Sequence, residues 1–419
     1  MNTVATTEQV PSAARASGLR RILPLLGPAL VAGVAYLDPG NVASNMTAGA
    51  AYGYLLVWVV IAGNLMAWLV QYLSAKLGLI TGKSLPELLG QRITKRWQRW
   101  LYWLQAEIVA MATDLAEVIG GAIALNLLFD LPLLAGGIIT SVISMIVLSV
   151  HSRRGAVQFE RVIIAMMAII AVGFSAGIVM NPPDGAATVG GLMPRFDGSG
   201  SVLLAASILG ATIMPHAIYA HSALTRDRFG LVEPGAHRLT VLRATRIDVS
   251  IALAIAGAVN LVILLLAASS LQGVAGTETL QGAHSALQSS LGAPIATMFA
   301  VGLLASGLAS TSVGAYAGAE IMHGLLRTRI PLMLRRLITL IPALAILAIG
   351  FDPTAALVLS QVLLSFGIPF ALIPMVMFTA RRSVLGDAVN RWYTTVAACI
   401  AAALLVALNV ALLALLLVG

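Results

Sequence analysis

Long apolar stretches, separated by short polar segments, recur along almost the whole chain. A run of about 20 apolar residues is long enough to cross a lipid bilayer as an α-helix. The pattern predicts an all-α polytopic membrane protein with eleven spans, at about 22–47, 54–78, 100–128, 132–150, 161–180, 201–224, 247–271, 294–323, 337–350, 354–380 and 393–418. The ninth span is short for a bilayer, and its helix could begin earlier, within the apolar residues 332–334.

Composition supports this interpretation. The chain is 59% hydrophobic and 10% charged, whereas soluble domains carry about 25% charged residues. The longest loops, at about 181–200, 225–246 and 272–293, are too short for a soluble domain. The single cysteine, Cys399, excludes an internal disulfide and a cysteine-based zinc site.

The basic residues fall on alternate loops. If the N-terminal tail, 1–21, is placed in the cytoplasm, all of the 25 Lys and Arg residues except Arg195 fall in or beside cytoplasmic segments. Cytoplasmic loops of membrane proteins carry such an excess. We therefore expect a cytoplasmic N-terminus and an extracytoplasmic C-terminus. The net charge of +8 is explained by topology, and we expect no nucleic-acid partner.

Two spans contain a short polar interruption. Asp38-Pro39-Gly40-Asn41 interrupts the first span and Met214-Pro215-His216 the sixth. Spans one to five cover 22–180 and spans six to ten cover 201–380, so each set of five opens with an interrupted helix. Because five is odd, the second set enters the membrane with the opposite orientation. This is the inverted-repeat layout of secondary transporters, with an additional helix at 393–418.

The prolines in these interruptions release backbone carbonyl groups. Proline has no N–H, so a helix that continues through Pro39 or Pro215 leaves the carbonyl four residues earlier without its partner. Those carbonyls belong to Ala35 and Ala211. Secondary transporters bind their substrates where two such broken helices meet.

The side chains beside the freed carbonyls suit a transition-metal ion. Asp38 and Asn41 offer oxygen ligands, which would suit Mg²⁺ or Ca²⁺ equally well. The thioether of Met214 is a soft ligand that favours ions such as Mn²⁺, Fe²⁺, Co²⁺ and Cd²⁺. The alternative is a surface β-turn at Asp38 and a packing role for Met214.

Span three carries three carboxylates on one broad helical face, namely Glu107, Asp114 and Glu117. A charged side chain inside a membrane costs about 3 kcal/mol on insertion scales. We interpret these acids as candidates for proton movement, with a structural network of Asn or Arg partners as the alternative. His216 has a suitable intrinsic pKa for gating protons, or it is a hydrogen-bonded spacer. His221 is a weaker candidate.

Four segments together resemble one transporter family. They are Ala35-Tyr36-Leu37-Asp38-Pro39-Gly40-Asn41, Ala211-Thr212-Ile213-Met214-Pro215-His216, Thr113-Asp114-Leu115-Ala116-Glu117 and Leu334-Arg335-Arg336-Leu337. They look like motifs of the natural resistance-associated macrophage protein family, which are proton-coupled transporters of manganese and iron. The resemblance covers all eleven spans and is strongest to the bacterial manganese transporters.

The resemblance implies a fold and a set of ligands. The implied fold is leucine-transporter-like, with helices 1 and 6 broken and an extra helix 11. The implied metal ligands are the Asp38 carboxylate, the Asn41 oxygen, the Met214 sulfur and the Ala211 carbonyl, joined in some states by Ala35 and Gln361.

The resemblance also implies a proton route. It leads from Asp38 to Asp114 and Glu117, with Glu107 beside it. Arg336 and Arg228 are expected to pair with these acids, and His216 flanks the metal site.

The expected function is therefore proton-coupled import of divalent transition metals by alternating access across a prokaryotic plasma membrane. Mn²⁺ is the first expected substrate, and Fe²⁺ suits the same ligands. We expect no cofactor, no enzymatic activity and no obligate protein partner. One alternative is a cation-coupled transporter of an amino-acid-like solute with the same fold, although Asp38 would repel a substrate carboxylate. A channel is another, and an intramembrane metalloenzyme would need three fixed His or carboxylate ligands.

Overall fold

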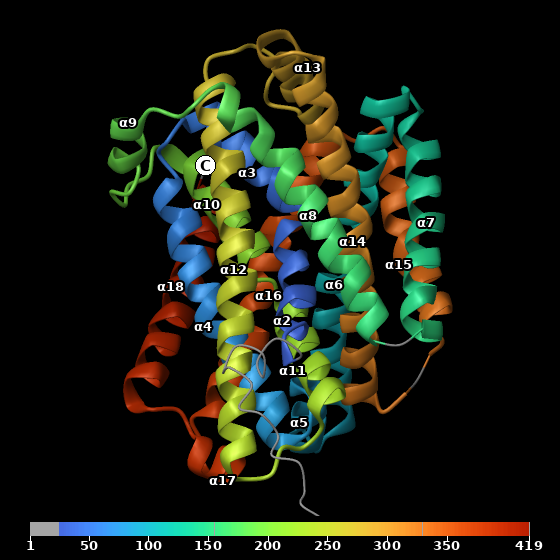
Figure 1. Ribbon diagram of the computed structural model, residues 1–419, viewed down its shortest axis with the longest axis vertical. Helices are drawn as coiled ribbons and strands as arrows, with labels where there is room; N and C mark the ends of the chain where they lie inside the picture. Colours follow the sequence, from blue (N-terminus) through green and yellow to red (C-terminus); the bar gives the residue numbers. More distant parts are fainter. Residues whose placement is uncertain (1–24, 155, 329, 419) are drawn as a thin grey trace, which may run out of the picture.

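Long helices run roughly along one axis of the molecule (Figure 1). The computed structural model describes residues 25–154, 156–328 and 330–418. Throughout these residues the regular structure is helical. The predicted N-terminal tail, 1–21, lies outside the described residues.

The first half of the described chain contains α2 (Pro28–Val34), η2 (Ala35–Leu37), α3 (Pro39–Tyr52), α4 (Val57–Thr81), α5 (Leu85–Arg92), α6 (Arg96–Phe129), α7 (Leu133–Arg154), α8 (Ala156–Met180) and α9 (Gly185–Gly190). The second half contains α10 (Gly198–Thr212), α11 (Pro215–Phe229), α12 (Ala236–Ser270), α13 (Leu280–Leu291), α14 (Ala293–Leu326), α15 (Leu332–Ala348), α16 (Pro353–Thr379), α17 (Arg382–Leu385), η3 (Gly386–Ala388) and α18 (Trp392–Val418).

The predicted spans are present as helices. Eight stretches of the described chain are long and apolar enough to cross a membrane, and shorter apolar helices lie at Pro28–Leu37 and Leu133–Ile146. With α15 they give eleven crossing segments, which confirms the predicted fold class. The main difference is at α12, which begins at Ala236 instead of about 247. Its first turns are rich in arginine, so hydropathy alone places the start of this helix too late.

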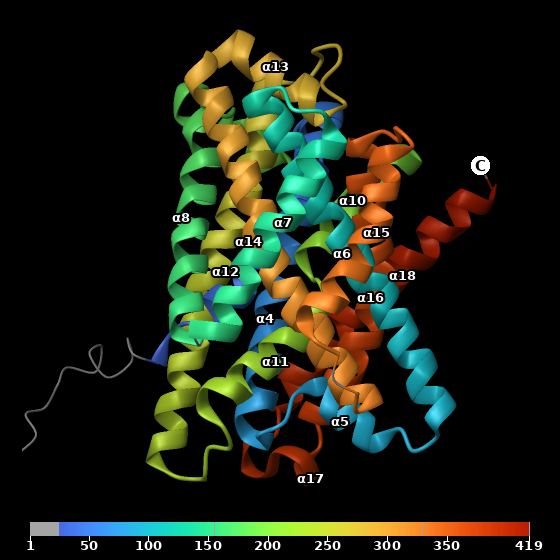
Figure 2. The same cartoon turned by 90° about the vertical axis from the view of Figure 1, so that its right-hand side faces the viewer.

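The two ends of the bundle differ in their connections. Helices α5 and α17 lie at one end, together with the turn from α11 to α12, and α9 and α13 lie at the other (Figures 1 and 2). The first end carries most of the Lys and Arg clusters predicted from the sequence, and we call it the basic end.

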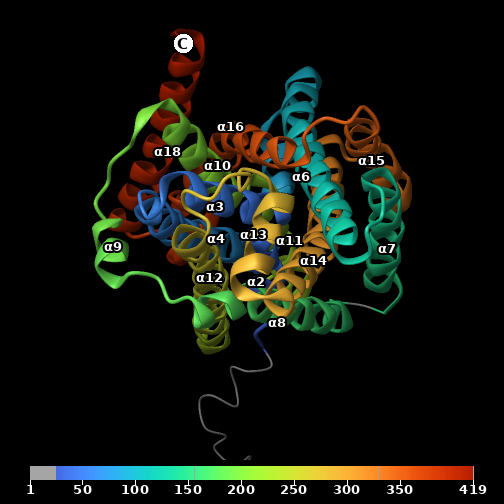
Figure 3. The same cartoon turned by 90° about the horizontal axis from the view of Figure 1, so that it is seen from above.

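The two interrupted spans lie inside the bundle. Viewed along its length, α2, α3, α10 and α11 occupy the middle, while α7, α15 and α18 are peripheral (Figure 3). Helices α6, α12, α14 and α16 pack around this middle group. Any site built at the interruptions is therefore surrounded by protein.

Candidate metal site

The first interruption is a true break in the helix. Helix α2 continues into the 3₁₀ turn η2, which ends at Leu37. The backbone is extended at Asp38 (φ −67°, ψ 161°), and a new helix, α3, begins at Pro39. The Asp38 carboxylate accepts a 2.8 Å hydrogen bond from the backbone N–H of Asn41 and so caps α3. Because Asp38 and Asn41 have no exposed surface, the surface-turn alternative is wrong.

The second interruption has the same form. Helix α10 ends at Thr212, Ile213 and Met214 have non-helical backbone angles, and α11 begins at Pro215. Pro215 occupies the first helical position, where its missing N–H costs nothing. Met214 is fully buried at this break.

The helices that flank the two breaks are joined directly. The hydroxyl groups of Ser44 on α3 and Ser207 on α10 lie 2.6 Å apart in a hydrogen bond. One of the two hydroxyl groups donates to the other, and the one that accepts keeps its own proton for a backbone carbonyl: Ser44 Oγ lies 2.7 Å from the carbonyl oxygen of Gly40, and Ser207 Oγ lies 3.1 Å from that of Val358 on α16. The halves that lead away from the basic end are therefore tied to one another and to α16.

Gln361 on α16 lies against both breaks. Its amide nitrogen donates a 3.1 Å hydrogen bond to the Asp38 carboxylate. A Cβ atom at Gly40 would overlap the Gln361 side chain, and one at Gly210 would overlap the Gln361 carbonyl. Glycine at these two positions is what allows α16 to approach both breaks so closely.

The side chains gathered here offer a mixed set of donor atoms. The carboxylate of Asp38, the amide oxygens of Asn41 and Gln361, and the sulfur of Met214 all belong to residues without exposed surface, as do Ala35 and Ala211. The Gln361 oxygen has no hydrogen-bond partner among the described residues. The Asn41 oxygen accepts a 2.6 Å bond from Asn45 and keeps a second lone pair. In this conformation the group is closed to solvent.

A cluster of the kind that a metalloenzyme uses is absent from the described residues, which contain no group of three or more His, Cys, Asp or Glu side chains able to hold a metal ion. The candidate site instead combines a single carboxylate with amide, carbonyl and thioether donors. A divalent ion held by this set of donors would have one charged ligand.

A polar network beneath the first break was missed by the sequence analysis. The Tyr36 carbonyl accepts hydrogen bonds from Asn41 (2.6 Å) and Asn260 (2.9 Å). The Tyr36 hydroxyl accepts from Gln71, whose amide oxygen lies 2.7 Å from Nδ1 of His221. A polar Gln71 within an apolar span was the available signal. These contacts satisfy a carbonyl that the break releases and fix the inner side of the site.

The span-three acids form two ion pairs with α15. Arg336 pairs with Asp114 and lies 3.7 Å from Glu117, and all three side chains are at most 2% exposed. Glu107 pairs with the neighbouring Arg335 at 2.7 Å. Arg336 thus faces two carboxylates. When Asp114 and Glu117 are both ionised, the three side chains together carry a net negative charge.

His216, which follows the second break, contacts α6. Its Nδ1 lies 3.2 Å from the Thr113 hydroxyl, which precedes Asp114 on α6. Its Nε2 has no partner among the described residues. Since His216 is two residues from Met214, the imidazole lies between the proposed ligands and the acids of α6.

The predicted pairing of Arg228 with the span-three acids is wrong, because those acids pair with Arg335 and Arg336. Within the part of the chain that the structure describes, Arg228 lies 4.0 Å from Glu160 on α8. Close by, Asp248 on α12 accepts hydrogen bonds from the backbone N–H groups of Gly27 (3.1 Å) and Ala29 (2.9 Å). These charged residues hold the start of α2, which the sequence pattern alone did not indicate.

A further ion cluster, which we call the Arg226 cluster, lies at the basic end. Arg226 is 2.7 Å from Glu87, 2.7 Å from Asp227 and 3.0 Å from Glu320. It joins α5, α11 and α14 beside a cavity of about 460 Å³. Partial burial acts to raise the pKa of Glu87, but hydrogen bonds from Ser84 and Arg226 outweigh it, and the pKa is lowered. Glu87 therefore stays ionised at neutral pH as a partner of Arg226.

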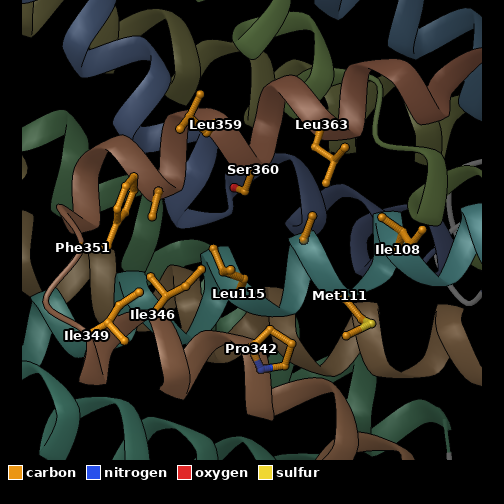
Figure 4. A pocket seen from close by; sticks show the side chains of 12 residues that line it. Ile108, Met111, Leu115, Pro342, Ile346, Ile349, Phe351, Leu359, Ser360 and Leu363 are labelled. Atoms are coloured by element: carbon orange, nitrogen blue, oxygen red, sulfur yellow. The ribbon is translucent and has the colours of Figure 1, made fainter.

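Figure 4 shows a separate cavity of about 450 Å³ between α6, α15 and α16. Its lining is apolar except for the Ser360 hydroxyl, and includes Ile108, Leu115 and Phe351. Without a carboxylate it has no strong ligand for a divalent cation. The candidate metal site is therefore the buried group at the two breaks.

Comparison with known proteins agrees with the motifs. The sequence model described as "Natural resistance-associated macrophage protein-like" matches residues 29–415. The divalent metal cation transporter MntH of Mycobacterium tuberculosis is 58% identical over 395 residues, covering 94% of this chain and 92% of that protein.

Solved structures give the same result for the fold. The Eremococcus coleocola manganese transporter superposes with a TM-score of 0.84 at 29% identity, covering 96% of this chain and 88% of that one. MhsT, solved in complex with L-phenylalanine, superposes with a TM-score of 0.58 at 14% identity, covering 96% and 98%. The second likeness concerns the fold alone.

Proposed function

This chain belongs to the natural resistance-associated macrophage protein-like family, and we propose that it is a proton-coupled importer of divalent transition-metal ions with Mn²⁺ as its main substrate. Family membership and the similar transporters make it a multi-pass membrane protein that transports metal ions, and not an enzyme. The choice of ion, the coupling to protons and the direction of transport are the proposed part.

The observation that carries the proposal is the donor set at the two breaks. Asp38 and Gln361 are hydrogen-bonded to each other, and Asn41, Met214 and Ala211 are buried on the adjoining turns. A single carboxylate leaves one positive charge of a divalent ion uncompensated, so the ion is not trapped. The thioether favours softer ions over Ca²⁺ and Mg²⁺.

The proton-carrying role rests on the path from this site into α6. His216, Thr113 and Asp114 follow one another from the break to the Arg336 ion pair. Glu117 has two oxygen atoms without hydrogen-bond partners among the described residues. We infer that these groups receive the proton that leaves Asp38 when the metal binds.

The proposed orientation in the membrane rests on the charge distribution. Basic loops face the cytoplasm in membrane proteins, so we place the basic end in the cytoplasm of a bacterial cell. The repeats 22–180 and 201–380 would then rock about the site, with 393–418 outside them. The Arg226 cluster joins α5, α11 and α14 at the cytoplasmic exit.

The test is uptake into proteoliposomes with an acidic outside. We expect Mn²⁺, Fe²⁺, Co²⁺ and Cd²⁺ to accumulate while the inside acidifies, and Ca²⁺ and Mg²⁺ to be poor substrates. Vesicles with Asp38→Ala provide the control. Uptake of amino acids in place of metals would favour the organic-solute alternative, and metal uptake without saturation or proton movement would favour a channel.

A further inference from the structure

A groove at the basic end lies between α4, α12, η3 and the start of α18, with a volume of about 730 Å³. In Figure 1, α4 is visible between α12 and α18 above α17. None of the residues that line the groove is a proposed metal ligand or belongs to the proposed proton path. It exists because α18, the helix outside the two repeats, begins beside α4 and α12.

The groove is positively charged without internal compensation. Its lining contains four basic residues, Lys76, Arg238, Arg246 and Arg391. None of them makes an ion pair with a carboxylate within the described ranges. The acidic residue of the lining, Asp387, is paired with Arg382 at 3.4 Å. Lys76 Nζ donates a 3.0 Å hydrogen bond to the side chain of Asn390. The four basic groups of the groove therefore have no carboxylate partner among the described residues.

Aromatic side chains hold two of these cations in place. The Arg246 guanidinium stacks over the Trp68 ring, 5.6 Å from its centroid, and the Trp68 indole donates a 3.0 Å hydrogen bond to Ser250. Arg391 donates to the Tyr393 hydroxyl at 2.9 Å and lies 6.0 Å from its ring centroid. Preorganised guanidinium groups suit the planar, bidentate recognition of phosphate.

The remaining wall of the groove is apolar. Leu69 and Leu242 line it, and so do Leu65 and Leu239, which are 67% and 69% exposed. Leu65 precedes Lys76 by eleven residues on α4, so the groove extends about 16 Å along the helix toward the middle of the bundle. On α12 the leucines lie between Arg238 and Arg246, and on α4 the apolar wall continues past Trp68, the partner of Arg246, to Leu65. Cationic and apolar side chains therefore line the same groove.

We propose that this groove binds an anionic glycerophospholipid. The headgroup phosphate lies among Arg238, Arg246 and Lys76, and an acyl chain runs along Leu69 and Leu65. Basic pockets between transmembrane helices on the cytoplasmic side bind anionic lipid headgroups by this combination. The bound lipid fills the space between α18 and the helices of the two repeats.

Membrane topology alone does not account for the arrangement. The positive-inside rule explains why basic residues lie at this end, and Arg96 at the start of α6 is an example on an exposed surface. It does not explain four unpaired cations that share one groove with stacked aromatic rings and an apolar continuation. A free phosphate would use the cations only and gain nothing from the leucines.

The experiment is native mass spectrometry of the full chain in detergent. Phosphatidylglycerol and phosphatidylcholine with identical acyl chains are titrated separately. We expect phosphatidylglycerol to bind more tightly. The double variant Arg238→Gln/Arg246→Gln should weaken it about 25-fold, from about fivefold for each charge removed, with phosphatidylcholine binding unchanged. Equal binding of the two lipids, or undiminished phosphatidylglycerol binding in the double variant, would overturn the proposal.

Three controls sharpen the result. Arg96→Gln removes a basic residue at the same end but outside the groove and should leave lipid binding unchanged; a loss equal to that of the double variant would show a nonspecific charge effect. Arg246→Lys keeps the charge and should retain most of the binding, which separates charge from misfolding. Millimolar inorganic phosphate should not displace phosphatidylglycerol. Displacement would identify a site for a free anion and would overturn the proposal that the groove binds a lipid.

Discussion

The side-chain amide of Gln361 donates a hydrogen bond to the carboxylate of Asp38, with 3.1 Å between the two atoms. This contact joins α16 to the break of the first span and leaves the Gln361 oxygen without a partner among the described residues. We propose that, when a cation binds Asp38, rotation of the amide brings this oxygen to the ion as a further ligand.

The first prediction concerns the charge of the site. Asp38→Ala removes its single carboxylate, so binding and transport of every divalent ion should be lost. The measurement is isothermal titration with Mn²⁺ and Cd²⁺, together with uptake into proteoliposomes. Glu233→Ala, at an exposed position, is the control and should behave like the unmodified chain. Retained binding in Asp38→Ala would place the metal elsewhere.

Substitution of Gln361 should reduce metal binding only in part, in contrast to the loss expected for Asp38→Ala. Gln361→Leu keeps the size of the side chain but removes both the hydrogen bond to Asp38 and the candidate ligand oxygen. We expect Mn²⁺ affinity to fall about tenfold, which corresponds to about 1.4 kcal/mol, while some transport persists. Unchanged affinity would limit Gln361 to a packing role against the two breaks.

The acids of α6 should control proton coupling and not metal binding. Asp114→Asn removes the charge that pairs with Arg336, and Glu117→Gln removes its neighbour. We expect Mn²⁺ binding to remain largely intact, while metal-driven acidification inside proteoliposomes is lost in Asp114→Asn and weakened in Glu117→Gln. If both variants keep the proton uptake and the pH dependence of the unmodified chain, these acids form a structural network.

Much of the fold could be predicted because its causes are local. Apolar runs of membrane-spanning length gave the spans, and prolines inside them gave the two breaks. The ligand candidates followed because polar atoms at such breaks are rare. The start of α12 was placed too late, since arginines in its first turns lowered the hydropathy of a helix that extends past the apolar region.

Contacts between distant segments could not be predicted in the same way. The Ser44–Ser207 hydrogen bond, the Arg228–Glu160 pair and the Arg226 cluster all join residues far apart in the chain. Each depends on how neighbouring helices rotate about their own axes. The periodicity of each helix shows which residues are charged but not which residue of another helix each one faces. For this reason Arg228 was assigned to the wrong acids.

The Arg226 cluster makes a prediction about access from the basic end. Arg226→Gln leaves Glu87, Asp227 and Glu320 to repel one another, so the closed arrangement of α5, α11 and α14 should loosen. In a Cys399→Ser background, a cysteine at the buried Ala220 should react several-fold faster with a membrane-impermeant thiol reagent. Arg382→Gln breaks a largely exposed pair and should have no effect. Equal labelling rates in all variants would show that the Arg226 cluster does not control access from the basic end.

The last prediction concerns discrimination between ions, which is a difference of affinities and responds to the loss of a single ligand. Met214 is the one soft donor in the proposed ligand set, whereas Asp38, Asn41 and the carbonyls remain after its removal. Met214→Ala should therefore weaken Cd²⁺ strongly and Mn²⁺ more modestly, and the all-oxygen site should admit Ca²⁺ or Mg²⁺. The measurement is competition of Ca²⁺ and Mg²⁺ against Mn²⁺ uptake in both proteins. If the alkaline earths compete no better in the variant, the sulfur does not set selectivity and Met214 serves packing at the break.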